Sequence, residues 1–166
     1  MLLSSFQPLI DQRSRVLVLG SMPGVESLAR GEYYAYPRNL FWRLMQDLLG
    51  VDAQAPYERR TEALLANGIG LWDVLQHAER AGSLDKDIVR ASETPNDFAA
   101  LLADYPALRA FAFNGQKAGS VFDRRVHLPA TIPLVRLPLP STSPANASVR
   151  YADKLAAWRV LLDYVA

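Results

Sequence analysis

Two short segments near the start of the chain combine residue types that could bind a planar ligand. One is a turn whose backbone could approach a ligand closely because glycine and proline dominate it. It consists of Gly20, Ser21, Met22, Pro23 and Gly24. The turn has neither the Gly-Lys-Ser/Thr ending of a phosphate loop nor the glycine spacing of a dinucleotide-binding motif. An ordinary strand-to-helix turn explains it equally well, so both interpretations stay open.

The other segment is aromatic and runs from residue 33 to residue 42 (YYAYPRNLFW). Its tyrosines, Tyr34 among them, could stack on a planar base, although core packing of a long connection is the plainer alternative. Asn39 carries an amide that could orient a reactant. It also stands where a helix should begin, and asparagine is a preferred N-cap. From the residues alone the cap is the favoured interpretation.

A third segment near the C-terminus is rigid and rich in hydroxyl groups. It contains Ser141, Thr142, Ser143, Pro144, Ala145 and Asn146. Hydroxyls and the amides of a helix N-terminus are good ligands for phosphate, whereas a polar loop that caps a helix is a common alternative. Arg150 and Lys154 follow on a predicted helix and could hold a phosphate backbone or form a solvated face.

Elsewhere, the Asn114 amide could bind a base edge, and Asp73 could contact a ligand or make a structural hydrogen bond.

Apolar runs alternating with helical patterns predict the elements that position these segments. Buried strands are predicted at residues 15–19, 69–74, 109–113 and 133–137. Helices are predicted at 40–49, 57–67, about 94–105 (with Thr94 as cap and Pro95 in its first turn), 116–122 and 148–165. This order indicates an α/β fold: a single domain, residues 1–166, built as a three-layer sandwich with a central, mainly parallel four-stranded sheet flanked by helices. Ligands bind beyond the carboxyl ends of such strands, where the polar segments are expected.

Composition excludes several classes of chemistry. The chain has no cysteine, which rules out disulfides, thiolate zinc sites, cysteine-ligated iron–sulfur clusters and a cysteine nucleophile. The only two histidines are far apart in the sequence, so we expect no histidine-rich metal site. Serine-hydrolase, zincin and zinc-deaminase motifs are missing. No stretch is long and apolar enough for a membrane span, and the start does not look like a secretion signal, so a cytoplasmic protein is expected. The net charge of +1 neither indicates nor excludes binding to nucleic acid.

Together the three motifs resemble the uracil-DNA glycosylase superfamily, and most closely its hypoxanthine-DNA (deoxyinosine) glycosylase branch. The resemblance runs from about residue 15 to residue 158. It implies an enzyme that flips a deaminated base out of DNA and hydrolyses its N-glycosidic bond, leaving an abasic site in base excision repair. Hypoxanthine, uracil and xanthine are the candidate bases. The implied partner is DNA containing such bases, and the implied state is a monomer without cofactor or metal.

The resemblance also implies roles for single residues. Asn39 matches the residue that orients the attacking water, and Tyr34 matches the aromatic residue that stacks on the flipped base. The first turn and Asn114 are expected to line the base site. The segment 141–146 and Arg150 are expected to contact DNA, with positive charge concentrated near Arg38, Arg150 and Lys154.

Two departures from the superfamily pattern keep alternatives open. Met22 stands where many members have Asp or Asn, and Leu139 where many have His. These apolar replacements motivate a non-catalytic binder of damaged DNA on the same scaffold. The near-zero net charge motivates a third possibility, a small-molecule nucleoside hydrolase.

Overall fold

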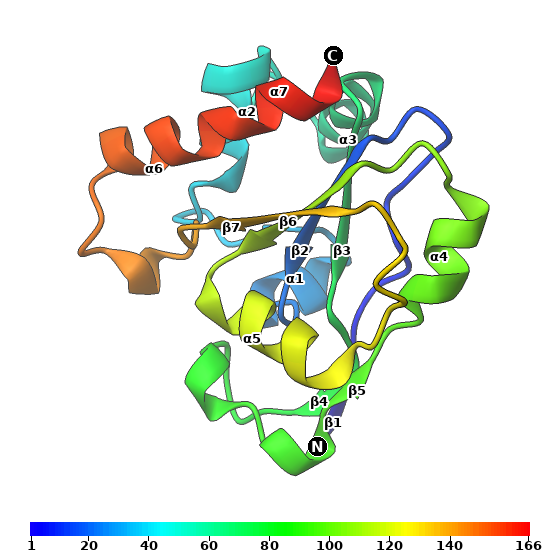
Figure 1. The fold of residues 1–166 in the computed structure, drawn as a ribbon. Coiled ribbons are helices and arrows are strands. Elements are labelled where there is room, and N and C mark those ends of the chain that lie inside the picture. The colour runs from blue at the N-terminus through cyan, green and yellow to red at the C-terminus, as the bar shows by residue number, and fades with distance from the viewer.

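The computed structural model describes all 166 residues and shows a parallel sheet between two layers of helices (Figure 1). The four strands are β2 (Val16–Gly20), β3 (Ile69–Asp73), β6 (Ala110–Asn114) and β7 (Val135–Leu139), in the order β3-β2-β6-β7. Every neighbouring pair is parallel. The predicted α/β class and four-stranded parallel sheet are therefore confirmed. The strand predicted at 133–137 begins and ends two residues later.

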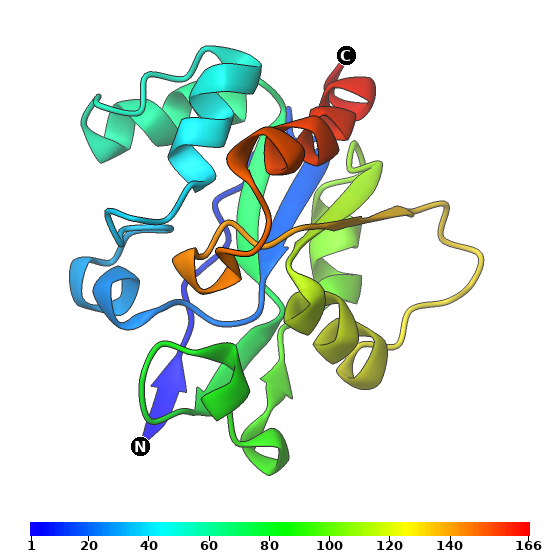
Figure 2. The ribbon, with the colours of Figure 1, turned by 90° about the vertical axis from the view of Figure 1, so that its left-hand side faces the viewer.

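Alternating side chains of the central strands supply both faces of the sheet with core residues, because successive residues of a strand point to opposite faces. Val16 and Val18 pack under α2 (Phe41–Leu49), α3 (Tyr57–Ala66) and α6 (Tyr151–Trp158). Leu17 and Leu19 pack against α4 (Phe98–Asp104) and α5 (Gln116–Arg125). Figure 2 shows the first group of helices at the top, with the N-terminus at the bottom. The predicted three layers are present.

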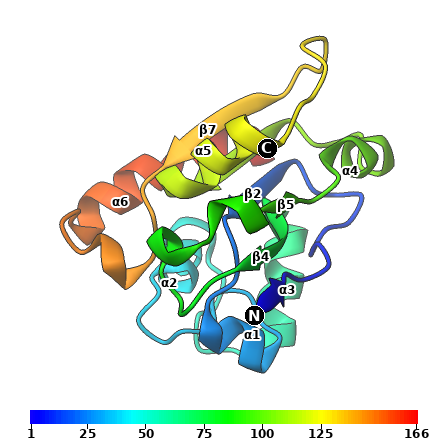
Figure 3. The same ribbon diagram turned by 90° about the horizontal axis from the view of Figure 1, so that it is seen from below.

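A second, small sheet was not predicted from the sequence. It consists of β1 (Leu2–Ser4), β4 (Leu75–Glu79) and β5 (Thr94–Pro95), in the antiparallel order β1-β4-β5 (Figure 3). The prediction that Thr94 and Pro95 begin a helix is wrong. Pro95 lies in an edge strand, where a missing amide proton is tolerated, and α4 begins only at Phe98, capped by the side chain of Asp97.

The remaining elements are short. They are α1 (Val25–Arg30), the 3-10 turns η1 (Asp85–Asp87), η2 (Arg90–Ser92), η3 (Pro144–Asn146) and η4 (Arg159–Leu161), and α7 (Leu162–Val165). The predicted continuous helix at 148–165 is thus α6, η4 and α7 in succession. No helix is both long and apolar enough to cross a membrane.

Phe111 tests the core under α4 and α5. Its ring is fully buried on β6, between the rings of Phe98 and Phe122. Phe111→Ala is expected to lower the free energy of unfolding by about 3–5 kcal/mol, because it removes buried apolar surface and leaves a cavity. The matched control is Val135→Ala on the edge strand β7, where the side chain is 38% exposed. Urea denaturation of both variants measures the difference, and equal losses would contradict this description of the core.

Candidate functional site

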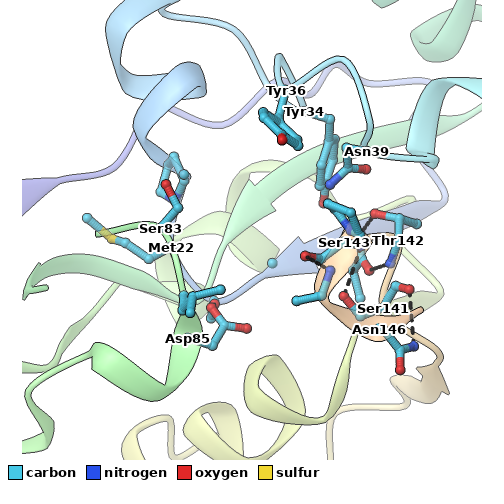
Figure 4. Close-up of a pocket in the computed structure, with 18 of the residues that line it drawn as sticks. Met22, Tyr34, Tyr36, Asn39, Ser83, Asp85, Ser141, Thr142, Ser143 and Asn146 are labelled. Carbon is cyan, nitrogen blue, oxygen red and sulfur yellow. Dashed lines mark hydrogen bonds between the residues drawn. The ribbon is translucent and has the colours of Figure 1, made fainter. Parts of the chain in front are cut away.

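A cavity of about 1220 Å³ opens at the carboxyl ends of the strands (Figure 4). The chain leaves β2 toward the helices on one face of the sheet, α2 and α3, and leaves β6 toward α5 on the other face. Neighbouring connections that diverge in this way leave a crevice between them, the usual ligand site of open α/β sheets.

Nearly all the residues singled out in the sequence line this one cavity. They are Gly20, Ser21, Met22, Pro23, Gly24, Tyr34, Asn39, Asn114, Ser141, Thr142, Ser143, Pro144, Ala145 and Asn146. Segments that are far apart in the sequence therefore meet around one space. Arg150 is not among the lining residues; its exposed side chain pairs with Asp153 at 3.0 Å at the start of α6.

The expectation that Lys154 adds positive charge to the surface is wrong. Lys154 is only 1% exposed, and its burial lowers the pKa of its ammonium group. A side chain enclosed in this way cannot reach a phosphate backbone. Positive charge near the cavity instead comes from the exposed Arg38 and Arg150 and from Lys86, which lines the cavity wall.

Thr142 joins three parts of the site. Its backbone amide donates to Oδ1 of Asn114 (2.9 Å), while Nδ2 of Asn114 donates to its hydroxyl (3.0 Å). Its carbonyl oxygen accepts a hydrogen bond from the amide of Leu40 (3.0 Å). The end of β6, the loop after β7 and the start of α2 are therefore fixed to one another through a residue that is 1% exposed.

The loop after β7 is rigid because its own side chains hold it. The hydroxyl oxygen of Ser141 accepts from the amide of Ser143 (3.1 Å), and that of Ser143 accepts from the amide of Ala145 (3.2 Å). On α6, the indole nitrogen of Trp158 donates to the carbonyl of Pro140 (2.9 Å). Since each serine hydroxyl acts as acceptor in these contacts, its own proton stays available for an anionic ligand.

Tyr34 adopts an unusual backbone conformation to place its ring in the cavity. Its φ of 56° lies in the left-handed region, which bulky residues rarely adopt outside strained functional sites. The ring stacks on Phe41, with centroids 4.2 Å apart and planes 22° apart. Burial, with the nearby charge of Asp73, raises the pKa of the Tyr34 hydroxyl, so this hydroxyl stays protonated at neutral pH.

Asn39 lies just before α2, supports its first turn and faces the cavity. Its Oδ1 accepts a hydrogen bond from the amide of Phe41 at 3.0 Å, the contact expected of an asparagine that starts a helical turn. The N-cap residue of α2 is Leu40, so the prediction that Asn39 is the N-cap is wrong by one residue. Because the side chain also lines the cavity, its capping contact does not remove it from the site.

One segment of the site, residues 80–86, was not predicted from the sequence. It makes hydrogen bonds that support the turn at residues 20–24. Ser83 accepts a hydrogen bond from the amide of Val25 (2.8 Å), Asp85 accepts one from the hydroxyl of Ser21, and Arg80 donates to the carbonyl of Pro23. Residues 83–86 also line the cavity. They match no motif, and their mixed charge is the only signal in the sequence.

Asp73 is the most perturbed acid of the site. It ends β3, is 4% exposed, and its Oδ2 is buried without a hydrogen-bond partner. Burial and the nearby charge of Asp85 raise the pKa of its carboxyl to about 7, against the opposing effect of Arg80. Near neutral pH this group is therefore present in both protonation states. No cluster of three or more acidic, histidine or cysteine side chains is arranged to hold a metal ion.

Comparison with known proteins gives consistent matches. The family model of the uracil DNA glycosylase superfamily matches residues 7–162. The chain is similar to proteins named hypoxanthine DNA glycosylase from Methanosarcina barkeri (43% identity, 69% of this chain and 72% of the relative) and Methanosarcina acetivorans (41%, 72% and 75%). A solution NMR structure of a candidate uracil DNA glycosylase from M. acetivorans has a TM-score of 0.84 and 34% identity over 99% of each chain.

Replacing Asp73 tests the perturbed carboxyl. The folded protein binds this proton more tightly than the unfolded chain does. The stabilising contribution of the protonated carboxyl to the free energy of unfolding is therefore lost as pH rises from about 4 toward 7. Asp73→Asn imitates the neutral form. We expect its unfolding temperature to exceed that of the wild type by several degrees at pH 8, and the difference to shrink near pH 4. The control is Asp163→Asn, which changes an exposed carboxyl; a pH-independent difference for Asp73→Asn would contradict the expectation.

Two substitutions test the link through Thr142. Thr142→Val keeps the side-chain volume but leaves Nδ2 of Asn114 without its partner, which should cost about 1–3 kcal/mol of unfolding free energy. Thr142→Ser keeps the hydroxyl and should cost less. Urea denaturation, with limited proteolysis of the loop after β7, compares the two variants. If valine were tolerated as well as serine, the hydroxyl contact would contribute nothing.

Proposed function

The chain belongs to the uracil DNA glycosylase superfamily, whose members hydrolyse N-glycosyl bonds, and on that premise we propose that it removes hypoxanthine from DNA and leaves an abasic site. The DNA glycosylase activity follows from the family and its named relatives. Hypoxanthine is the favoured base because the two Methanosarcina relatives carry that name. Uracil and xanthine are the further candidates.

One observation supports the proposal above all: three distant motifs line a single cavity at the strand ends. A glycosylase needs such a cavity, because its target bond cannot be reached inside the base stack and the nucleotide must be turned out of the duplex. The stacked rings of Tyr34 and Phe41 form an aromatic surface in this region. In our proposal Tyr34 stacks on the extruded base.

The reaction needs little basicity from the protein. As the glycosidic bond breaks, the sugar gains oxocarbenium character and the base gains negative charge. Asn39, in our proposal, orients the attacking water through its amide. An amide is a poor proton acceptor, so this role requires that bond cleavage runs ahead of water attack. The remaining task is to stabilise the departing base with hydrogen-bond donors.

The loop of residues 141–146 is proposed to hold the DNA backbone. The hydroxyl groups of Ser141 and Ser143 accept the hydrogen bonds within the loop, so they can still donate to a phosphate. The rigidity of the loop reduces the entropy lost when it binds. Exposed Arg38 and Arg150 supply positive charge beside it. Contacts of this kind predict an affinity for DNA that falls as salt concentration rises. Because one chain forms the whole cavity, we propose that the enzyme acts as a monomer.

The decisive experiment is cleavage of labelled oligonucleotides that carry a single hypoxanthine, uracil or xanthine, in single and double strands. Alkali converts an abasic site into a strand break that a gel resolves. We expect product from the hypoxanthine substrate. No product from any base would contradict the proposal. Retention of abasic DNA without turnover would favour a non-catalytic binder, and release of hypoxanthine from free inosine would favour a nucleoside hydrolase.

Asn39→Ala tests the proposed water-orienting residue. We expect a loss of about 10²-fold or more in single-turnover rate, as for other positioned polar groups. The control is Asn67→Ala, another asparagine at a helix end, which bonds the carbonyl of Ala63 away from the cavity. Thermal unfolding accompanies both assays. A folded Asn39→Ala enzyme with full activity would remove Asn39 from the chemistry, and an unfolded one would favour its capping role.

A further inference from the structure

One buried acid in the cavity has no part in the roles proposed so far. Asp73 ends β3 and is held there by its backbone, whose carbonyl accepts a hydrogen bond from Nδ2 of Asn96 (2.8 Å). Its carboxyl lies against Gly20, in register on the neighbouring strand: a Cβ at position 20 would stand 2.7 Å from Oδ1. Asp73 lines the cavity, and its Oδ2 has no hydrogen-bond partner in the protein. Because buried polar groups are nearly always paired, a carboxyl in this state at the cavity wall is a candidate for contact with a ligand.

We propose that Asp73 binds the extruded base as a neutral carboxylic acid and donates a hydrogen bond to the carbonyl oxygen that deamination creates. This inference rests on the proposed function, and it supplies that function with a donor to the departing base. Leu139, which stands where many superfamily members have histidine, is apolar and cannot fill that role.

The chemistry of the substrate favours the neutral form. Deamination replaces an amino group, a hydrogen-bond donor, with a carbonyl oxygen, an acceptor. A carboxylate only accepts, so it would pair with the amino group of the undamaged base, whereas a neutral carboxyl can donate to the new oxygen. When the glycosidic bond breaks, negative charge spreads onto the base. A donor at its carbonyl then binds more strongly, while a carboxylate would repel it.

The surroundings of Asp73 support this protonation state. The charged and titratable groups that face it are Asp85, Arg80, Tyr33 and Tyr34. Burial and Asp85 raise its pKa to about 7, whereas Arg80 lowers it. Both tyrosine hydroxyls have raised pKa values and stay uncharged. At slightly acidic pH the carboxyl is therefore mostly neutral, and it loses its proton as pH rises through about 7.

The test is the single-turnover rate on the hypoxanthine oligonucleotide between pH 5.5 and 8.5. For the wild type we expect the rate to fall as pH rises through about 7. Asp73→Asn keeps a donor but cannot titrate, so its rate should lie within about tenfold of the wild type at pH 6 and should not show this fall. Asp73→Ala should lose about 10²-fold at every pH, the usual effect of removing one stabilising donor.

A second comparison does not alter Asp73 itself. Gly20→Ala should push the carboxyl aside and slow cleavage at pH 6, because the new methyl group overlaps Oδ1. Gly82→Ala is the control, since nothing lies within 4 Å of a Cβ there. If an Asp73 variant fails to fold, as judged by thermal unfolding, the inference is tested by the wild-type pH profile and by the comparison of Gly20→Ala with Gly82→Ala.

Several outcomes would overturn the inference while leaving the glycosylase activity intact. One is a wild-type rate that rises through pH 7, with Asp73→Asn as slow as Asp73→Ala, which would mean that the ionised form acts. Another is a folded Asp73→Ala enzyme that cleaves at the wild-type rate. If the wild type cleaves no base at all, the proposed function fails and the inference falls with it.

Discussion

The hydrogen bonds around Thr142 are the constraint on which the site depends. Asn114, at the end of β6, binds both the amide and the hydroxyl of this residue, and the amide of Leu40 binds its carbonyl oxygen. These contacts are buried, where a lost partner is costly, so the three segments keep one relative position. The aromatic segment and the serine-rich loop face the same cavity because this connection holds both.

Parallel strands bring the polar segments to one edge, and this part of the fold could be predicted from the sequence. Continuous apolar runs identify β2 and β6 because both faces of these strands are buried. The polar residues that follow such runs then gather at the carboxyl edge. The comparisons show the family, which the motifs already indicated.

Other features depend on tertiary contacts that leave no local pattern. The support of the first turn by Arg80, Ser83 and Asp85 could not be predicted, since it comes from a loop without regular periodicity.

Lys154 illustrates a different limit of prediction from sequence, the burial of a charged residue. The residues of the C-terminal segment that become fully buried are Lys154, Trp158 and Leu161. A helical period in the sequence does not determine which polar residue at the border of the buried side will be enclosed, and here that residue is Lys154.

The link between Leu40 and Thr142 also bears on how the enzyme is made. Three of the four strands of the parallel sheet end by Asn114 and can pair before residue 142 and the helix that holds its loop through Trp158 have been synthesised. Contacts between segments so distant in sequence form slowly, since a long loop must close first. A nascent chain on the ribosome therefore cannot close the cavity until residues 142–158 have been synthesised, even if its sheet begins to pair much earlier.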